Sequence, residues 1–294
     1  MSRWTAADIP DQTGRTVVIT GANSGLGLQA TEALTTAGAR VVMACRDTSR
    51  AESARQGLSQ PERAEVVELD LADLDSVRAA GETLSGRQLD VLINNAGVMN
   101  VPLGRTAQGH EMQFGVNVLG HFALTQQLAP ALSDRVVWLG SIMHRFGSIV
   151  LDDLDWNRRR YIPMSAYAAS KLACVMLAYE QQRRLDAAGW PLMAVAAHPG
   201  YSATNLQYHS GSGLQDLVMR AAEKIPFLVQ PAERGALPEL YAATVRDVPP
   251  GAYIGPDGPG ELTGHPRVVG STGASRDESV AAALWDRCEA LVAP

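Results

Sequence analysis

Residues 20–27 read TGANSGLG and are the first part of the sequence whose residue types suggest chemistry. They follow a short β-branched run and open a helical pattern. This context is typical of a phosphate-binding turn, because glycine lets the backbone approach the ligand and a helix N-terminus attracts anions. We expect Gly21 to make the turn, Gly25 to admit a pyrophosphate and Gly27 to pack helix against strand, in a GxxxGxG spacing wider than the GxGxxG fingerprint. The predicted phosphate loop comprises Gly21, Asn23, Ser24, Gly25, Leu26 and Gly27.

The second β-branched run ends at Cys45, and Arg46 follows it. In nucleotide-binding α/β folds an acidic residue at this strand end binds the ribose hydroxyls of NAD, whereas an arginine nearby accommodates the 2′-phosphate of NADP. The acid is missing here, and we expect Asp47, one place further on, to cap the next helix. Since arginine binds phosphate with two hydrogen bonds, the sequence predicts that NADP(H) is preferred over NAD(H). The alternative is that Arg46 is an ordinary solvated surface residue.

Further short motifs follow in a fixed order. They are LINNAG at 92–97, Asn117 in VNVLGHF, Ser141 in VVWLGS, Tyr167 and Lys171 in YAASK, and HPG at 198–200. Together with TGANSGLG they resemble the short-chain dehydrogenase/reductase family over residues 14–205. The Cys45–Arg46 pair, the 26-residue spacing from Ser141 to Tyr167 and the tail YIGPDGPGELTG are most similar to its retinol-dehydrogenase-like and protochlorophyllide-reductase-like branch.

The resemblance implies a catalytic role for four residues. Tyr167 would protonate a carbonyl oxygen as hydride arrives, or act as the base in the reverse direction. A free tyrosine titrates near pH 10, and a nearby cation favours the phenolate; Lys171 is one helical turn later and therefore on the same face. In the family this lysine also bonds the nicotinamide ribose. Ser141 would hydrogen-bond the substrate oxygen, and Asn117 resembles the asparagine that holds a helix kink and a proton-relay water.

The resemblance also implies cofactor contacts after the third and fourth predicted strands. Asp70 resembles the aspartate that accepts a hydrogen bond from the adenine amino group, with Leu71 beside it. Asn94 and Ala96 would line the adenine ribose, and Gly97 would let the chain pass close to it. The plain alternative for Asp70 is a helix cap or a turn residue.

A last group of implied cofactor contacts follows the sixth predicted strand. Pro199 and Gly200 would shape a turn, and Thr204 resembles the residue that bonds the nicotinamide carboxamide. Plain alternatives are a turn residue for Thr204, a helix cap for Asn117 and a loop serine for Ser141.

Strands and helices must alternate to position these residues. The predicted strands are 16–20, 40–44, 64–69, 89–93, 135–139, 192–197 and a short one near 252–254. The predicted helices are 24–37, 47–58, 73–84, 163–188, 214–225, 231–244 and 276–292. Such alternation produces right-handed crossovers and a parallel sheet covered on both faces. We therefore predict an α/β, doubly wound, Rossmann-type fold of about seven strands. It forms a single domain over 1–294, with a lid-like insertion around 205–230.

Composition narrows the classes of function. The chain has 294 residues, 46% of them hydrophobic, and a net charge of −6, so a broad basic face for nucleic acid is not expected. No 18-residue apolar stretch or signal peptide is evident, and the three cysteines and six histidines show no ligand spacing for a metal. We expect a cytoplasmic protein with no membrane anchor. Arginine makes up 23 of the 25 basic residues, which indicates a GC-rich bacterial coding bias, and one of the two lysines is Lys171.

The predicted function is an NADP(H)-dependent oxidoreductase acting on an apolar carbonyl or alcohol. The substrate prediction depends on an apolar stripe within 214–225 that could line a pocket with Met99, Met164, Tyr201 and Phe227. The plain alternative is that this stripe packs on the body of the protein. One alternative is a catalytically silent NADP-binding sensor, which would be expected to lose Tyr167 or Lys171. Others are a reductase of a carbon–carbon double bond and an epimerase or lyase of the wider superfamily. A homodimer or homotetramer through the helix at 163–188 is possible in this family.

Overall fold

An eight-stranded sheet forms the centre of the computed structural model, which describes residues 3–202 and 230–293. The strand order is β3-β2-β1-β4-β5-β6-β7-β8; all neighbours pair in parallel except β7 and β8. The strands are β1 (Thr16–Thr20), β2 (Arg40–Cys45), β3 (Ala64–Glu68), β4 (Leu89–Asn94), β5 (Leu132–Leu139), β6 (Met193–Ala197), β7 (Tyr253–Pro256) and β8 (Pro266–Val268). The order reverses beside β1, and this switch point is where open α/β sheets bind ligands.

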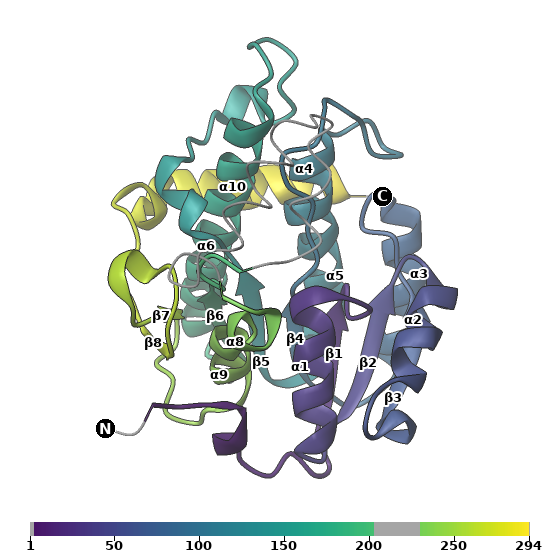
Figure 1. The fold of residues 1–294 in the computed structure, drawn as a ribbon. Helices are drawn as coiled ribbons and strands as arrows, with labels where there is room; N and C mark the ends of the chain where they lie inside the picture. Colours follow the sequence, from purple (N-terminus) through teal and green to yellow (C-terminus); the bar gives the residue numbers. More distant parts are fainter. Residues whose placement is uncertain (1–2, 203–229, 294) are drawn as a thin grey trace, which may run out of the picture.

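Helices cover both faces of the sheet (Figure 1). One face packs on α1 (Gly25–Thr36), α2 (Thr48–Gln56) and α9 (Leu237–Thr244), with α8 (Ala232–Gly235) beside α1. The other packs on α3 (Leu74–Ser85), α5 (His121–Leu128), α6 (Pro163–Ala187) and α10 (Glu278–Val292). The central strands are buried on both sides and therefore consist of continuous apolar runs.

Local sequence signals set the helix boundaries. The predicted cap of α2 is confirmed, because the Asp47 carboxylate accepts from the Arg50 amide at 2.9 Å. Asp73 caps α3 in the same way through the Asp75 amide, as predicted. Gly38 follows α1 at φ +100°, a left-handed conformation that glycine adopts without strain.

The predicted Rossmann-type class is confirmed, and four details differ. The sheet has eight strands, because the three-residue β8 adds an antiparallel edge strand. β5 begins at Leu132, three residues before the predicted start. The single helix predicted over 231–244 is two helices, α8 and α9. Between β4 and β5, where no helix is predicted, lie α4 (Met112–Phe114), a π-helical segment, η3 (Gly115–Gly120), and α5. The predicted lid and its helix lie outside the described residues, apart from residue 230.

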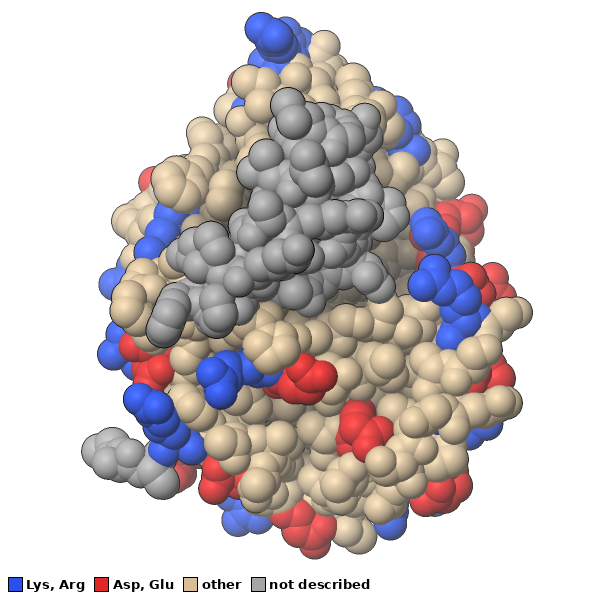
Figure 2. Space-filling view, in the orientation of Figure 1, with Lys and Arg blue, Asp and Glu red and all other residues tan. Residues whose placement is uncertain are grey.

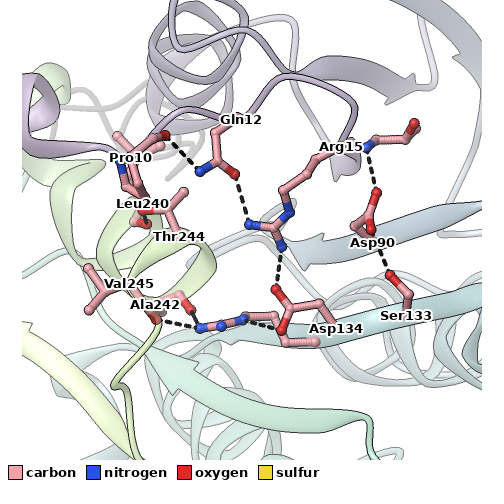
Figure 3. A network of polar contacts seen from close by, with 12 residues as sticks. Pro10, Gln12, Arg15, Asp90, Ser133, Asp134, Leu240, Ala242, Thr244 and Val245 are labelled. Carbon is pink, nitrogen blue, oxygen red and sulfur yellow. Dashed lines mark hydrogen bonds and ion pairs between the residues drawn. The ribbon is translucent and has the colours of Figure 1, made fainter.

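A polar network connects residues at the amino-terminal ends of the central strands (Figure 3). The motifs lie at the opposite, carboxyl ends of these strands. Arg15 forms an ion pair with Asp134 at the start of β5, and the buried Arg135 donates to the carbonyl oxygens of Ala242 and Val245, both at 2.9 Å. These contacts tie the N-terminal segment and the end of α9 to β5. Their role is therefore to fix the scaffold.

The outer surface carries charges of both signs. On the face shown in Figure 2, blue and red side chains alternate around the periphery. Within the described ranges, none of the helices combines the length and apolarity needed to span a bilayer.

Candidate active site

A cavity of about 650 Å³ opens at the carboxyl ends of the parallel strands. Its lining includes most of the residues that the sequence singles out, although they come from six different strand ends and from α6. The predicted residues that line it are Gly21, Asn23, Ser24, Gly25, Leu26, Arg46, Asp70, Leu71, Ala96, Gly97, Ser141, Tyr167, Lys171, Pro199 and Gly200. Gly27, Asn94 and Asn117 are not part of this lining. Thr204 lies outside the described residues.

The glycines of the phosphate loop let the backbone pack closely against neighbouring residues. Gly21 and Gly25 have φ of +67° and +55°, and a Cβ at Gly21 would lie 3.0 Å from that of Ala96. A Cβ at Gly27 would lie 2.7 Å from the Gly21 carbonyl oxygen, so only glycine fits where α1 meets the loop. Ser24 begins α1 as its N-cap, and its hydroxyl makes no capping hydrogen bond. The loop therefore presents a helix N-terminus and a hydroxyl to the cavity.

The end of β2 contains no carboxylate at the ribose position. The Cys45 side chain is 2% exposed, and burial raises the pKa of its thiol to about 11, so the group is neutral at pH 7. Arg46 and Arg50 both line the cavity here, and within residues 3–202 and 230–293 neither pairs with a carboxylate. Asp47 is engaged in capping α2. Two cations beside an uncharged thiol fit a phosphate-bearing adenosine ribose. The pattern at 45–46 missed Arg50, which helix α2 brings alongside Arg46 through its first turn.

At the end of β4, two neighbouring asparagines point their side chains in opposite directions. Asn94, still in the strand, is 2% exposed and donates to the Thr125 hydroxyl on α5 at 2.9 Å, so its side chain points away from the cavity. Asn95 lines the cavity and donates to the Thr20 carbonyl at 2.7 Å. Successive side chains at a strand end point to opposite sides, which explains why a motif alone does not select the right member of the pair. Ala96 donates from its amide to the Thr20 hydroxyl at 2.9 Å.

Asp70 follows β3 and faces the cavity while stabilising its own turn. Its carboxylate accepts from the Ala72 amide at 2.9 Å, and its amide donates to the Ser76 hydroxyl at 2.9 Å. Turn formation and exposure to the cavity therefore coexist at this residue, and its second carboxylate oxygen accepts no hydrogen bond within the described residues.

Asn117 lies within the π-helical segment η3, a local widening that occurs frequently at functional sites. Its side chain clamps Val98, accepting from the amide at 2.8 Å and donating to the carbonyl at 3.0 Å, and also donates to the Ser170 hydroxyl at 2.9 Å. Asn117 thus ties the NNAG loop to α6. Gly97 of that loop lies next to both Asn117 and Lys171, since a Cβ there would lie 3.1 Å from Asn117 Oδ1 and 3.7 Å from Lys171 Nζ.

His121 is a buried residue that the motifs did not select. Burial lowers its pKa to about 3, so the imidazole is neutral. Nδ1 faces the Asn117 carbonyl at 3.1 Å and must carry the hydrogen, which leaves Nε2 to accept from the Thr20 hydroxyl at 2.8 Å. His121 therefore connects the π-helical segment with Thr20, the last residue of β1 directly before the phosphate loop.

Ser141, Tyr167 and Lys171 share one wall of the cavity. Ser141 lies two residues beyond β5 and caps the short helix η5 (Ile142–Phe146), its oxygen accepting from the Met143 amide at 3.2 Å. Tyr167 and Lys171 lie one turn apart on α6, and the ammonium donates to the Leu139 carbonyl at 2.7 Å. All three are less than 10% exposed. A hydroxyl, a phenol and a cation that line the same cavity can together bind and protonate one oxygen atom.

The remaining wall of the cavity is apolar. Four of the nine methionines contribute to it, together with four β-branched residues; these side chains are Val98, Met99, Val101, Met112, Val116, Ile142, Met143 and Met164. Met99, Met164 and Tyr201 line the cavity as expected from the sequence, whereas Phe227 and the stripe at 214–225 lie outside the described residues. Methionine side chains are flexible and polarizable and adapt to apolar ligands of irregular shape.

Comparison with known proteins agrees with this geometry. The family model described as short chain dehydrogenase matches residues 15–214, and the chain belongs to that family, whose members are nicotinamide-dependent oxidoreductases. Within it, the chain is similar to the retinol-dehydrogenase-like branch. It is 37% identical to human retinol dehydrogenase 13, over 95% of this chain and 85% of that protein. It is also 36% identical to mouse polyprenol dehydrogenase, over 94% and 83%.

A solved structure of an uncharacterized protein from Mycobacterium paratuberculosis superposes on this fold. The TM-score is 0.85 at 45% sequence identity, and the match covers 99% of this chain and 98% of that one. The architecture described here is therefore shared over the full length of a solved relative.

Proposed function

We propose that the protein is an NADP(H)-dependent oxidoreductase that interconverts a lipophilic alcohol and its carbonyl compound. The observation that carries this proposal is the single cavity. One end presents Cys45, Arg46 and Arg50 to a phosphorylated ribose, and the other places Ser141, Tyr167 and Lys171 beside an apolar wall. Hydride exchange requires a cofactor site and a proton donor at the substrate oxygen. The first end would supply the cofactor site, and the second would supply the proton donor.

The residues present divide the work between them. When bound, the nicotinamide cofactor supplies or accepts the hydride. In carbonyl reduction, the Ser141 hydroxyl would donate a hydrogen bond to the substrate oxygen, and Tyr167 would transfer its proton to that oxygen as charge develops. The ammonium of Lys171 stabilises the resulting phenolate, and it is free to exchange its hydrogen bond with the Leu139 carbonyl for one to a ribose.

The apolar wall supports a lipophilic substrate. Retinol dehydrogenase 13 and polyprenol dehydrogenase carry the names of long apolar alcohols, and four methionines line the cavity of this chain. Burying apolar surface stabilises binding by about 25 cal/mol per Å², so we propose that kcat/KM rises with the apolar area of the aldehyde.

A reductase assay tests the proposal. Purified protein is given NADPH or NADH with a series of aldehydes of increasing chain length, polyunsaturated long-chain aldehydes and small sugars, and cofactor oxidation is followed at 340 nm. The proposal predicts turnover with NADPH that increases with aldehyde length. Turnover confined to sugars, or preference for NADH, would contradict it.

A further inference from the structure

Glu261 joins the two loops that flank the proposed reaction centre, although it does not line the cavity. Its Oε2 accepts from Arg145 Nη2 at 2.8 Å and from His198 Nε2 at 3.2 Å. Arg145 belongs to η5, the segment that directly follows Ser141. His198 directly follows β6 and directly precedes the Pro199–Gly200 turn. A single carboxylate oxygen therefore bridges the loop of the proposed catalytic serine and the proposed nicotinamide loop.

The backbone around Glu261 is shaped to place this carboxylate. Glu261 has φ of +59°, a left-handed conformation that a residue with a side chain rarely adopts and that persists where the surroundings determine it. The next residue, Leu262, accepts from the Tyr201 amide at 2.7 Å through its carbonyl oxygen. A Cβ at Gly200 would lie 2.3 Å from that same oxygen. The C-terminal tail (residues 253–264) therefore contacts the Pro199–Gly200 turn through its backbone, and contacts the residue before that turn through the Glu261 side chain.

The protonation states of the bridge follow from its partners. The Gly200 amide donates to His198 Nδ1 at 3.3 Å, so the hydrogen is on Nε2 and points to Glu261. Burial lowers the pKa of His198, and hydrogen bonding from His198 lowers the pKa of Glu261, with Arg145 adding to this effect. The bridge thus consists of a neutral imidazole and an ionised carboxylate. A Cβ at Gly255 on β7 would lie 2.1 Å from His198 Nε2, so glycine there makes room for the ring.

Tyr253 on β7 extends the same support to the main chain of Ser141. Its ring lies between the imidazoles of His144 and His198, with centroid separations of 5.3 and 5.0 Å. The Ser141 carbonyl accepts from the Tyr253 hydroxyl at 3.3 Å and from His144 Nδ1 at 2.7 Å. A Cβ at Gly140 would lie 3.1 Å from the Tyr253 hydroxyl, which accounts for glycine directly before Ser141. The C-terminal tail therefore holds Ser141 through both β7 and Glu261.

We propose that Glu261 is a positioning residue: it holds the Ser141 loop and the Pro199–Gly200 turn at a fixed separation, so that substrate oxygen and nicotinamide meet in the geometry required for hydride transfer. This inference rests on the proposed function. It gives the C-terminal tail at 253–264 a role in the reaction. It also predicts that the two contacts of Glu261 affect different constants. The contact with Arg145 should affect kcat, because Arg145 lies in the loop of the proposed catalytic serine. The contact with His198 should affect the NADPH Kd, because His198 precedes the proposed nicotinamide loop.

The test compares Glu261→Ala, Glu261→Gln and Arg145→Met with the wild type. Glutamine keeps an oxygen that accepts from both partners, whereas alanine removes it and leaves two donors unpaired. Since a hydrogen bond to a charged group is worth about tenfold in an equilibrium, we expect Glu261→Ala to raise the NADPH Kd about tenfold and lower kcat about tenfold. Glu261→Gln should remain within about threefold of wild type in both constants. Arg145→Met should lower kcat while the NADPH Kd stays within about threefold.

Glu65→Ala is the matched control. Glu65 lies on β3, the edge strand at the far side of the sheet, and forms an ion pair with Arg87. Kd is measured by fluorescence titration, kcat under saturating NADPH, and the melting temperature for each variant. A merely structural role for Glu261 would lower the melting temperature while leaving Kd and kcat per folded molecule unchanged, and this result would overturn the inference. Equal loss in the alanine and glutamine variants would also overturn it. If the wild type neither binds NADPH nor turns over aldehydes, the proposed function itself fails, which is a separate outcome.

Discussion

Replacing Arg46 with alanine should weaken the binding of NADPH and leave the binding of NADH nearly unchanged. The guanidinium lines the cavity beside the neutral thiol of Cys45, where only the 2′-phosphate distinguishes the two cofactors. A hydrogen bond between charged groups contributes about 1.5–3 kcal/mol, and the exposure of Arg46 to solvent favours the lower value. About 1.5 kcal/mol corresponds to roughly a tenfold rise in the NADPH Kd.

Arg40→Ala is the matched control for Arg46→Ala. Arg40 begins β2 and is also exposed, but it lies six residues earlier, about 20 Å along an extended strand and beyond a Debye length of about 10 Å. Its removal changes the net charge equally without reaching the cofactor site. Calorimetric titration of both variants with NADPH and NADH provides the measurement. Equal weakening of both cofactors by Arg46→Ala, or equal effects of the two variants on NADPH, would refute a phosphate contact at Arg46.

Two further predictions concern the scaffold. Glu239 is buried with both carboxylate oxygens unpartnered within the described residues, and burial raises its pKa to about 8. The folded state therefore keeps a proton that the unfolded chain loses above about pH 4.3, so stability decreases from there to about pH 8. Glu239→Gln should remove this loss, worth about 4 kcal/mol at pH 8, and thermal melting at pH 5 and pH 8 should show a gain mainly at the higher pH. Gly27→Ala should lower stability by about 1–3 kcal/mol and abolish cofactor binding, because its Cβ would lie 2.7 Å from the Gly21 carbonyl oxygen. Gly86→Ala, which has open space around the new Cβ, should change neither quantity in urea unfolding and NADPH titration.

Periodicity predicted those parts of the fold that are set by local sequence. The buried β-branched runs and the Asp47 and Asp73 caps encode their structures within a few residues, and these elements were predicted close to their observed bounds. β8 could not be predicted in this way, because three residues that include a proline carry no periodic signal and pair only through β7. The π-helical segment was likewise missed, since its widened turn breaks the 3.6-residue period.

In the site, too, the residues marked by short motifs were predicted, and those fixed by contacts between distant parts of the chain were not. Ordered motifs placed Ser141, Tyr167 and Lys171 at the cavity, because strand ends in a parallel sheet gather at one edge. They did not distinguish Asn94 from Asn95, which depends on the facing of a strand end. Nor did they select Glu261, whose partners are more than 60 residues away in the chain. Contacts of that kind are fixed only by the packed tail.

Turnover by Tyr167→Phe is the most direct test of the central claim that this cavity carries out hydride exchange with Tyr167 as the proton donor. Tyr179→Phe is the matched control, since Tyr179 lies on the same helix and bonds Ser271 instead of facing the cavity. NADPH binding and NADPH oxidation with the best aldehyde are measured for wild type and both variants. We predict that Tyr167→Phe binds NADPH within about threefold of wild type and loses at least about a hundredfold in kcat, while Tyr179→Phe keeps its activity. Full activity in Tyr167→Phe would contradict the account.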